Sequence, residues 1–316
     1  MTGRHNVAMP SSDGFRSGFA CLVGRPNTGK STLTNALVGG KVAITSSRPQ
    51  TTRHAIRGVV HRPDSQLVLI DTPGLHRPRT LLGQRLNDLV RATWAEVDAV
   101  GFCTPADEKI GRGDTFVASS LAALARTPVL AVVTKIDRVS PDTLLQHLSR
   151  VAALGQEVGL DWADVVPVSA VSGEGVHTLE RLLVAQLPEG PAFYPDGDIT
   201  DEPEEVLVGE LIREAALEDL HDELPHSLAV VVEEMVPRAD RPVDRPLLDV
   251  HATVYVERSS QKPIIVGKSG ERIKRVGTAA RRQIESLLGT PVYLDLHVKI
   301  AKEWQRDPKQ LRRLGF

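Results

Sequence analysis

The stretch Gly24-Arg25-Pro26-Asn27-Thr28-Gly29-Lys30-Ser31 decides the fold of the N-terminal part of the chain. It fits G-x-x-x-x-G-K-[S/T], follows the apolar run Phe19 to Val23 and opens a helical pattern, which predicts a phosphate-binding loop. Glycines let backbone N–H groups converge on phosphates, and the helix start adds the positive end of a dipole. We expect Lys30 to reach the β and γ oxygens and Ser31 to hold Mg²⁺, and Thr32 is expected to bind the nucleotide as well.

Short β-branched apolar runs alternate with helical patterns as far as about Leu187, which is typical of a sheet covered by crossover helices. The runs are 19–23, 55–60, 67–70, 99–103, 129–133 and 165–168. A short polar turn around Pro63-Asp64 separates the second run from the third, so we expect those two strands to be antiparallel and the others parallel. The pattern predicts an α/β domain with a mostly parallel six-stranded sheet.

Asp71-Thr72-Pro73-Gly74 ends the third run, so Asp71 is expected to emerge beside the phosphate loop. An acidic residue there suits Mg²⁺, held directly or through water. Alone the tetrapeptide would be only a good turn. About 40 residues after a phosphate loop it indicates a switch element, with Gly74 close to the phosphates.

Thr134-Lys135-Ile136-Asp137 follows the fifth run and is similar to the guanine-reading motif of GTPases. The Asp137 carboxylate can accept from both N1–H and the exocyclic amine of guanine, whereas adenine offers a lone pair where a donor is required. The predicted nucleotides are therefore GTP and GDP. Ser169-Ala170, after the sixth run, is similar to a short motif whose backbone contacts the guanine oxygen.

Composition narrows the class of protein. Cys21 and Cys103 are the only cysteines and both lie in apolar runs, so we expect buried strand residues rather than a disulfide or metal cluster. The chain has no run of about 18 apolar residues, which argues against a spanning helix and favours the cytoplasm. Residues 1–17 lack the apolar core of a secretory signal and are expected to form a disordered tail.

The charge is uneven along the chain. The formal net charge is -2, yet residues 251–316 contain 14 Lys and Arg against 6 Asp and Glu, a local charge of +8. Such a region is either a surface that binds a polyanion or a solvated face. Within it lies Gly267-Lys268-Ser269-Gly270, a G-x-x-G loop of the kind with which KH domains clamp about four nucleotides. The predicted RNA contacts are Lys262, Gly267, Lys268, Ser269, Gly270, Arg272 and Lys274.

Element order supports this interpretation of the C-terminal part. A linker rich in Pro and Gly, 188–203, is followed by patterns for helix, strand, strand, short helix, long helix and strand. That order predicts an α+β KH domain of type II. The predicted divisions are a tail (1–17), a GTPase domain (18–187), the linker, the KH domain (204–303) and a C-terminal tail (304–316).

The first helix of that domain carries Glu210, Glu214 and Glu218 at intervals of four residues. These residues could form a functional surface. We expect instead a solvated face, opposite the apolar stripe of Val206, Leu207 and Leu211.

These motifs together resemble the Era family of bacterial ribosome-assembly GTPases, over about residues 18 to 303. The first switch is Gln50-Thr51-Thr52-Arg53-His54 and the second runs from Asp71 to His76. The resemblance implies a Ras-like domain that hydrolyses GTP, with Thr52, or alternatively Thr51, binding Mg²⁺. It also implies binding near the 3′ end of small-subunit ribosomal RNA and a role in assembling that subunit, by a monomer.

One position departs from the family pattern, and two others bear on how GTP would be hydrolysed. The family usually has Asn where this chain has Thr134, so one contact in the base pocket is shortened or lost. Leu75 stands where Ras-like proteins place the Gln that orients water, which predicts slow hydrolysis without help. Asn27 occurs in GTPases that recruit K⁺ between the phosphates, and it either does so here or only shapes the loop.

Two other functions remain open from sequence. One is an RNA-binding assembly chaperone in which GTP is mainly structural. The other is a GTPase at the inner face of the cell membrane, which the basic C-terminal part would contact.

Overall fold

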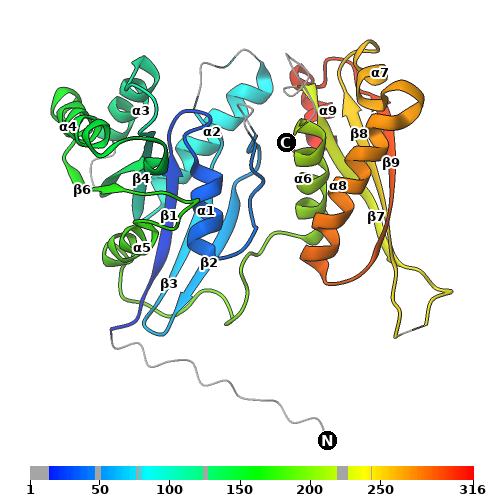
Figure 1. Ribbon diagram of the computed structural model, residues 1–316, viewed down its shortest axis with the longest axis horizontal. Coiled ribbons are helices and arrows are strands. Elements are labelled where there is room, and N and C mark those ends of the chain that lie inside the picture. The colour runs from blue at the N-terminus through cyan, green and yellow to red at the C-terminus, as the bar shows by residue number, and fades with distance from the viewer. Residues whose placement is uncertain are drawn as a thin grey trace, which may run out of the picture.

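The protein consists of two units, each built of helices and strands, that lie side by side and are joined by an extended segment (Figure 1). The computed structural model describes residues 14–46, 51–75, 78, 80–123, 127–218, 227–242 and 244–316. The first unit runs from blue to green in Figure 1, and the second from green to red.

A six-stranded sheet forms the centre of the first unit, in the order β2-β3-β1-β4-β5-β6. The strands are β1 (Arg16–Val23), β2 (Ile56–Arg62), β3 (Ser65–Asp71), β4 (Ala99–Pro105), β5 (Val129–Thr134) and β6 (Trp162–Pro167). β2 is antiparallel to β3 and the other neighbouring pairs are parallel, which confirms both predictions. The tight turn between β2 and β3 leaves no room for a crossover helix.

Helices cover both faces of this sheet. They are α1 (Lys30–Val38), α2 (Leu81–Glu96), α3 (Arg112–Ala122), α4 (Pro141–Val158) and α5 (Val176–Ala185). α1 and α5 pack on one face through residues such as Leu33 and Leu183, and the other three pack on the opposite face through Trp94, Leu121 and Leu154. The carboxyl ends of the parallel strands meet at one edge, so the loops that follow them can line one site.

The second unit has a three-stranded sheet in the order β7-β8-β9. Its elements are α6 (Glu204–Glu218), β7 (Ala229–Pro237), β8 (Leu248–Val256), α7 (Gln261–Val266), α8 (Glu271–Leu288) and β9 (Val292–Ile300). β7 and β8 are antiparallel, whereas β8 and β9 are parallel. α8 buries Val276, Ala280 and Ile284, which are spaced four residues apart on one face. The element order confirms the predicted type II KH arrangement.

Both predicted tails need correction. Residues 304–316 fold into a 3₁₀ turn (Trp304–Arg306) and α9 (Pro308–Arg313), because Trp304, Leu311 and Leu314 find buried places beside Tyr255 of β8. The Asp307 side chain caps α9 by accepting from backbone N–H groups. At the other end, Arg16 and Ser17 already belong to β1, and residues 1–13 lie outside the described part.

The predicted linker follows the edge of the first sheet. The N–H of Val59 donates to the carbonyl of Ile199 at 2.9 Å. The side-chain oxygen of Gln66 accepts from the N–H groups of Phe193 and Tyr194. These bonds hold the middle of the linker against β2 and β3.

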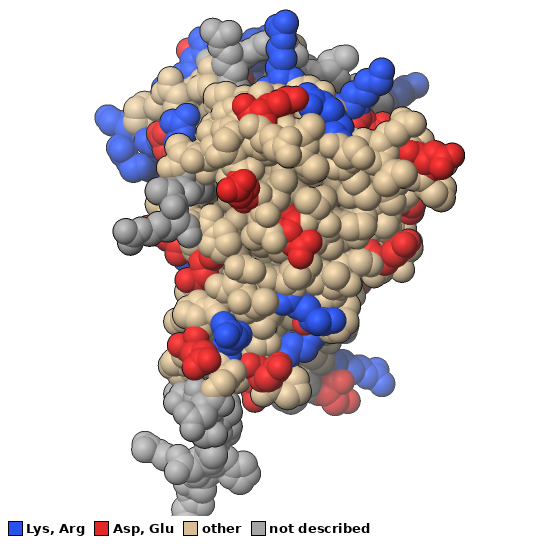
Figure 2. Space-filling model, turned by 90° about the vertical axis from the view of Figure 1, so that its left-hand side faces the viewer, with Lys and Arg blue, Asp and Glu red and all other residues tan. Residues whose placement is uncertain are grey.

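The helices and the surface charge indicate what kinds of partner the protein can contact. Within the described residues, no helix combines the length and apolar character needed to cross a membrane. On the face of the first unit turned away from the second, Lys and Arg lie interspersed with Asp and Glu (Figure 2). This face therefore offers mixed charge rather than one strong sign.

Candidate nucleotide site and nucleic-acid interface

The phosphate loop connects β1 to α1, as predicted. Gly24 must be glycine, because an added Cβ would lie 2.6 Å from the carbonyl oxygen of Cys103. Gly29 has φ 91° and directly precedes the first residue of α1, Lys30. The loop thereby directs its backbone N–H groups and the helix start toward the same space.

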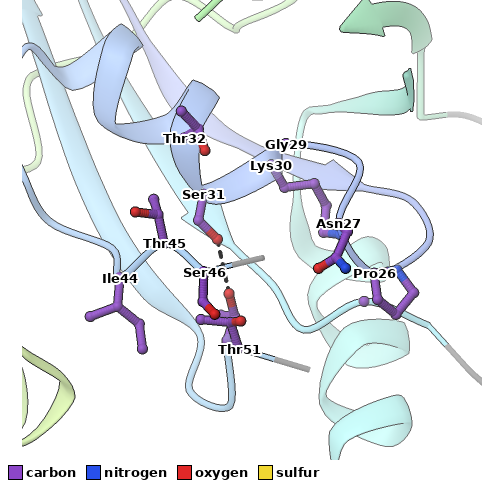
Figure 3. A pocket seen from close by; sticks show the side chains of 12 residues that line it. Pro26, Asn27, Gly29, Lys30, Ser31, Thr32, Ile44, Thr45, Ser46 and Thr51 are labelled. Atoms are coloured by element: carbon purple, nitrogen blue, oxygen red, sulfur yellow. Dashed lines mark hydrogen bonds between the residues drawn. The ribbon is translucent and has the colours of Figure 1, made fainter. Parts of the chain in front are cut away.

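Lys30 is almost wholly buried, and its ammonium group donates to the carbonyls of Arg25 at 2.8 Å and Gly24 at 3.3 Å. Burial lowers its pKa, while the nearby Asp71 opposes that shift. The amine is therefore held inside the curve of the loop, where Figure 3 shows it next to Asn27. This is the position from which it can meet phosphate oxygens.

Three oxygens converge beside Lys30. Ser31 Oγ lies 2.9 Å from Thr52 Oγ1 and donates to Asp71 Oδ2 at 2.7 Å, and Thr52 Oγ1 donates to the same carboxylate oxygen at 3.2 Å. The contact between Ser31 and Thr52 is the dashed line in Figure 3. Of the two alternatives at the first switch, the structure thus brings the hydroxyl of Thr52 to this cluster.

The environment of Asp71 fits a divalent cation. The side chain is fully buried, and its second oxygen, Oδ1, has no hydrogen-bond partner in the described part of the chain. Burial raises its pKa, because the charged form loses hydration, and the Ser31 hydrogen bond only partly offsets this. A carboxylate and two hydroxyls form the hard-oxygen donor set that suits Mg²⁺.

The second switch element contacts the phosphate loop directly. An added Cβ on Gly74 would lie 2.8 Å from the backbone nitrogen of Pro26, so this approach requires glycine. The pocket at the loop is also lined by Ile44, Thr45 and Ser46, which sequence reasoning missed (Figure 3). These residues follow α1 without a recognisable motif. Gln50 and His76, which were assigned to the switches, lie outside the described residues.

The predicted base-reading residues follow β5 and β6 at the same edge of the sheet. Ser169 donates its hydroxyl to Asp137 Oδ1 at 2.6 Å and accepts from the N–H of Ser172 at 3.1 Å. Ser169 therefore orients the Asp137 carboxylate with its side chain, a role beyond the backbone contact predicted for Ser169-Ala170. Lys135 adopts a left-handed backbone, with φ 59°.

Thr134 lies at the position where the GTPase motif usually has asparagine, and its side chain contacts the phosphate loop. Its buried hydroxyl donates to the carbonyl of Thr28 at 2.6 Å. A hydroxyl has one proton to donate, and this one is directed at the loop rather than at the space beside Asp137. With Thr in place of Asn, the loop after β5 therefore still contacts the phosphate loop through a side-chain hydrogen bond.

The G-x-x-G loop lies between α7 and α8. Gly267 (φ 76°), Ser269 (φ 52°) and Gly270 (φ 79°) have left-handed values of φ, and a Cβ on Gly267 would lie 2.7 Å from that of Arg272. Lys262, Lys268 and Lys274 are exposed around the loop. Arg272 differs from them, because it donates to the carbonyl of Ile264 and so also supports the end of α7.

A groove of about 300 Å³ lies between α8 and the edge strand β9. Its lining residues are Ile273, Lys274, Gly277, Thr278, Arg281, Tyr293, Leu294 and Leu296. Apolar side chains with Lys274 and Arg281 among them can contact both bases and phosphates. Sequence reasoning missed the β9 residues, whose only signal was their place on the last predicted strand.

The first switch packs against α6 of the second unit. Arg213 donates to the carbonyl of Thr51 and to both carboxylate oxygens of Glu210. Glu214 accepts from Lys41 and from the N–H of Thr45, the latter at 2.7 Å. The prediction of a solvated acidic face is therefore wrong for Glu210 and Glu214, which are buried by the other unit.

Arg53, the residue after Thr52, completes this interface. It is 3% exposed, donates to the carbonyl of Leu228 at 2.5 Å, and lies 5.7 Å from the ring centroid of Trp304. Burial, together with Arg213, lowers its pKa to about 9, so it remains charged at neutral pH. His54 stacks on Phe316 at 5.0 Å between ring centroids. Thr51 and Arg53, on the two sides of Thr52, are thus both in contact with the second unit.

Comparison with known proteins agrees with this architecture. Residues 19–135 match the family described as 50S ribosome-binding GTPase, and residues 223–305 match the KH domain. The chain is 67% identical to GTPase Era of Streptomyces coelicolor, over 97% of each chain, and 66% identical to GTPase Era of a Nocardioides species, over 100% of each.

Two solved structures are similar over nearly the whole chain. One is Era in complex with MgGDPNP and nucleotides 1506–1542 of 16S ribosomal RNA, with a TM-score of 0.90. The other is an Aquifex aeolicus Era variant bound to GDP·AlF₄⁻, with a TM-score of 0.89. Each is 34% identical in sequence and covers 95% of this chain and 99% of its own.

Proposed function

The chain belongs to the Era family of GTPases, and we propose that it binds the 3′ region of 16S ribosomal RNA under the control of its nucleotide state. In this role it assists assembly of the small ribosomal subunit. Support for the RNA target comes from the similar Era structure, which holds nucleotides 1506–1542. The exposed lysines around the G-x-x-G loop and the groove beside α8 supply suitable chemistry.

We assign the nucleotide site as follows. Gly24 to Thr32 wrap the phosphates, with Lys30 on the β and γ oxygens, and Asp137 accepts from guanine. Ser31, Thr52 and Asp71 would hold Mg²⁺, which neutralises charge that develops on the phosphates. Leu75 is buried and apolar, so it cannot orient the attacking water, and positioning falls to the backbone around Gly74.

The observation that carries nucleotide control is the contact between Arg213 and the carbonyl of Thr51. Thr51 directly precedes the hydroxyl assigned to Mg²⁺, and Arg53 directly follows it. When the γ phosphate leaves, the first switch loses its contacts with the phosphate and Mg²⁺ and changes conformation. The hydrogen bonds from Arg213 to Thr51 and from Arg53 to Leu228 then lose their geometry. Placement of the KH domain then changes with the nucleotide.

The test is RNA binding by the full chain in two nucleotide states. We expect a 3′ fragment of 16S RNA to bind more tightly with a non-hydrolysable GTP analogue than with GDP. Arg53→Ala should reduce that difference, whereas Lys309→Ala, which changes an exposed side chain of α9, should preserve it. Equal RNA affinity of the parent with both nucleotides would instead favour an assembly chaperone in which GTP is structural.

We further propose that Asn27 helps to recruit K⁺ between the phosphates, in the place that an arginine finger takes elsewhere. Its left-handed backbone, φ 64°, places it within the pocket lining. Turnover in K⁺ should exceed turnover in Na⁺ at equal ionic strength, and Asn27→Ala should abolish the difference. If the parent hydrolyses GTP equally in both salts, Asn27 only shapes the loop.

We also propose that the protein acts as a cytoplasmic monomer, since its RNA target is found there. The same basic surface has a second candidate occupant, the anionic inner face of the cell membrane. Co-sedimentation with anionic vesicles, with and without competing RNA, separates the two. Binding to vesicles that persists at saturating RNA would add a membrane contact to the proposed function.

A further inference from the structure

Arg25 fastens the phosphate loop to the start of α3. Its Nε donates to Asp114 Oδ1 at 2.7 Å, and its Nη2 donates to Glu108 Oε2 at 3.1 Å. Asp114 is fully buried, and its other oxygen accepts from the N–H of Gly111 at 2.8 Å. Gly113 makes room for the arginine, because an added Cβ would lie 2.5 Å from Arg25 Cδ.

Further ion pairs connect Glu108 and its neighbour Asp107 to the loop that carries Asp137. Glu108 lies 3.9 Å from Lys135 Nζ, and Asp107 lies 3.8 Å from the same nitrogen. Asp107 also accepts from Arg138 at 3.1 Å. The segment between β4 and α3 therefore contacts the phosphate loop on one side and the residues around Asp137 on the other.

The backbone of Arg25 holds other parts of the phosphate loop. Its carbonyl accepts from Lys30 Nζ at 2.8 Å and from the hydroxyl of Thr28 at 3.1 Å. A displaced Arg25 would therefore move the acceptor that aligns Lys30. Asp114 and Lys30 are thus linked through Arg25 by two hydrogen bonds, one to its side chain and one to its carbonyl.

The pair between Arg25 and Asp114 is the strongest link in this series. Asp114 is buried and shares a charge-assisted hydrogen bond, whereas Glu108 and Arg138 are largely exposed and their ion pairs are screened by solvent. Burial would lower the pKa of Arg25, but its bonds to Asp114 and Glu108 outweigh that effect and raise it. The guanidinium of Arg25 therefore keeps its charge over the physiological range of pH.

We propose that Asp114 is a positioning residue for the phosphate loop, and that Asp107 and Glu108 extend this support to the base-reading loop. The proposal rests on the proposed nucleotide site and adds a determinant of its affinity. This determinant lies outside the phosphate loop, the two switches and the two predicted base-reading motifs. Because the two loops share one support, contacts to the phosphates and to the base depend on each other.

The test is nucleotide affinity of full-length Asp114→Asn, which can still cap Gly111 but lacks the charge that Arg25 requires. We expect its Kd for GDP and GTP to rise roughly tenfold, the scale of one charge-assisted hydrogen bond. The Kd for GMP should change less, because fewer phosphate contacts are involved. Asp107→Asn should weaken GMP and GDP by similar factors, since it acts on the base side.

Glu157→Gln is the matched control, since it removes an exposed carboxylate from α4 and should leave all affinities unchanged. In a double-mutant cycle, Arg25→Gln combined with Asp114→Asn should cost no more than either change alone. A parent-like GDP affinity in Asp114→Asn, or a lowered melting temperature with unchanged affinity, would overturn the proposal. If Asp114→Asn does not fold, Asp107→Asn and Arg25→Lys test the same support. A parent that fails to bind GDP would instead refute the nucleotide site itself.

Discussion

At the scale of single residues, the geometry of this site depends on the acceptor to which each polar side chain donates its hydrogen bond. Thr134 illustrates the point, because its hydroxyl donates to the carbonyl of Thr28, whereas Asp137 accepts from Ser169. A position associated with base recognition thereby becomes a support for the phosphate loop.

Thr134→Val is expected to weaken GDP and GTP about fivefold, because one buried carbonyl loses a neutral hydrogen bond worth about 1 kcal/mol. Thr134→Ser should retain parent affinity, since it keeps the hydroxyl. Isothermal titration with GDP, GTP and XTP would measure both affinity and base preference. A change in the preference for guanine over xanthine would show that Thr134 contacts the base.

Asp137→Asn should exchange an acceptor for a donor opposite the guanine amine, while Ser169 can still hold the side chain. We expect the preference for GTP to be lost and XTP to be favoured. Competition between the two nucleotides, measured on one protein sample, gives the ratio directly. Normal GTP affinity in this variant would refute the assignment of the loop.

At the scale of helices and strands, local signals predicted most of the structure. The phosphate loop, the antiparallel β2–β3 pair and the α8–β9 succession each depend on neighbouring residues, so their sequence patterns were sufficient. The burial of Glu210 and Glu214 was not predictable, because it depends on residues of the other unit more than 150 positions away in the chain. The C-terminal turn and α9 were missed for the same reason, since their apolar residues bury only against distant partners.

The G-x-x-G turn should tolerate no negative charge, because its backbone must approach phosphates closely. Replacing both Lys268 and Ser269 with Asp leaves Gly267 and Gly270, and hence the turn, intact. Binding of single-stranded RNA should fall sharply, and its salt dependence, about -2 in log units for roughly three neutralised phosphates, should become shallower. Basal GTP hydrolysis should be nearly unchanged. RNA affinity equal to that of the parent would show that this turn is not the contact.

At the scale of the whole molecule, the two units share one buried interface, and the first switch lies inside it. Ile44 belongs to the apolar core of the KH domain, while Leu82 and Leu86 of α2 pack with Trp304 and Leu314. A residue shortly before the first switch and a helix shortly after the second therefore both contribute to the packing of the KH domain. Under the proposed function, nucleotide exchange is therefore expected to be coupled to movement of the KH domain.

The burial of Arg53 also makes it a latent protease site. Trypsin cleaves after arginine only where the backbone can enter its active site, and here the side chain is enclosed between the two units. The cleavage rate at Arg53 should therefore report how often the units separate, being slow with a non-hydrolysable GTP analogue and faster with GDP. Peptide mapping over time would measure it, with the exposed Arg112 as internal reference. Equal protection of Arg53 in both nucleotide states would mean that the interface stays closed throughout the GTPase cycle.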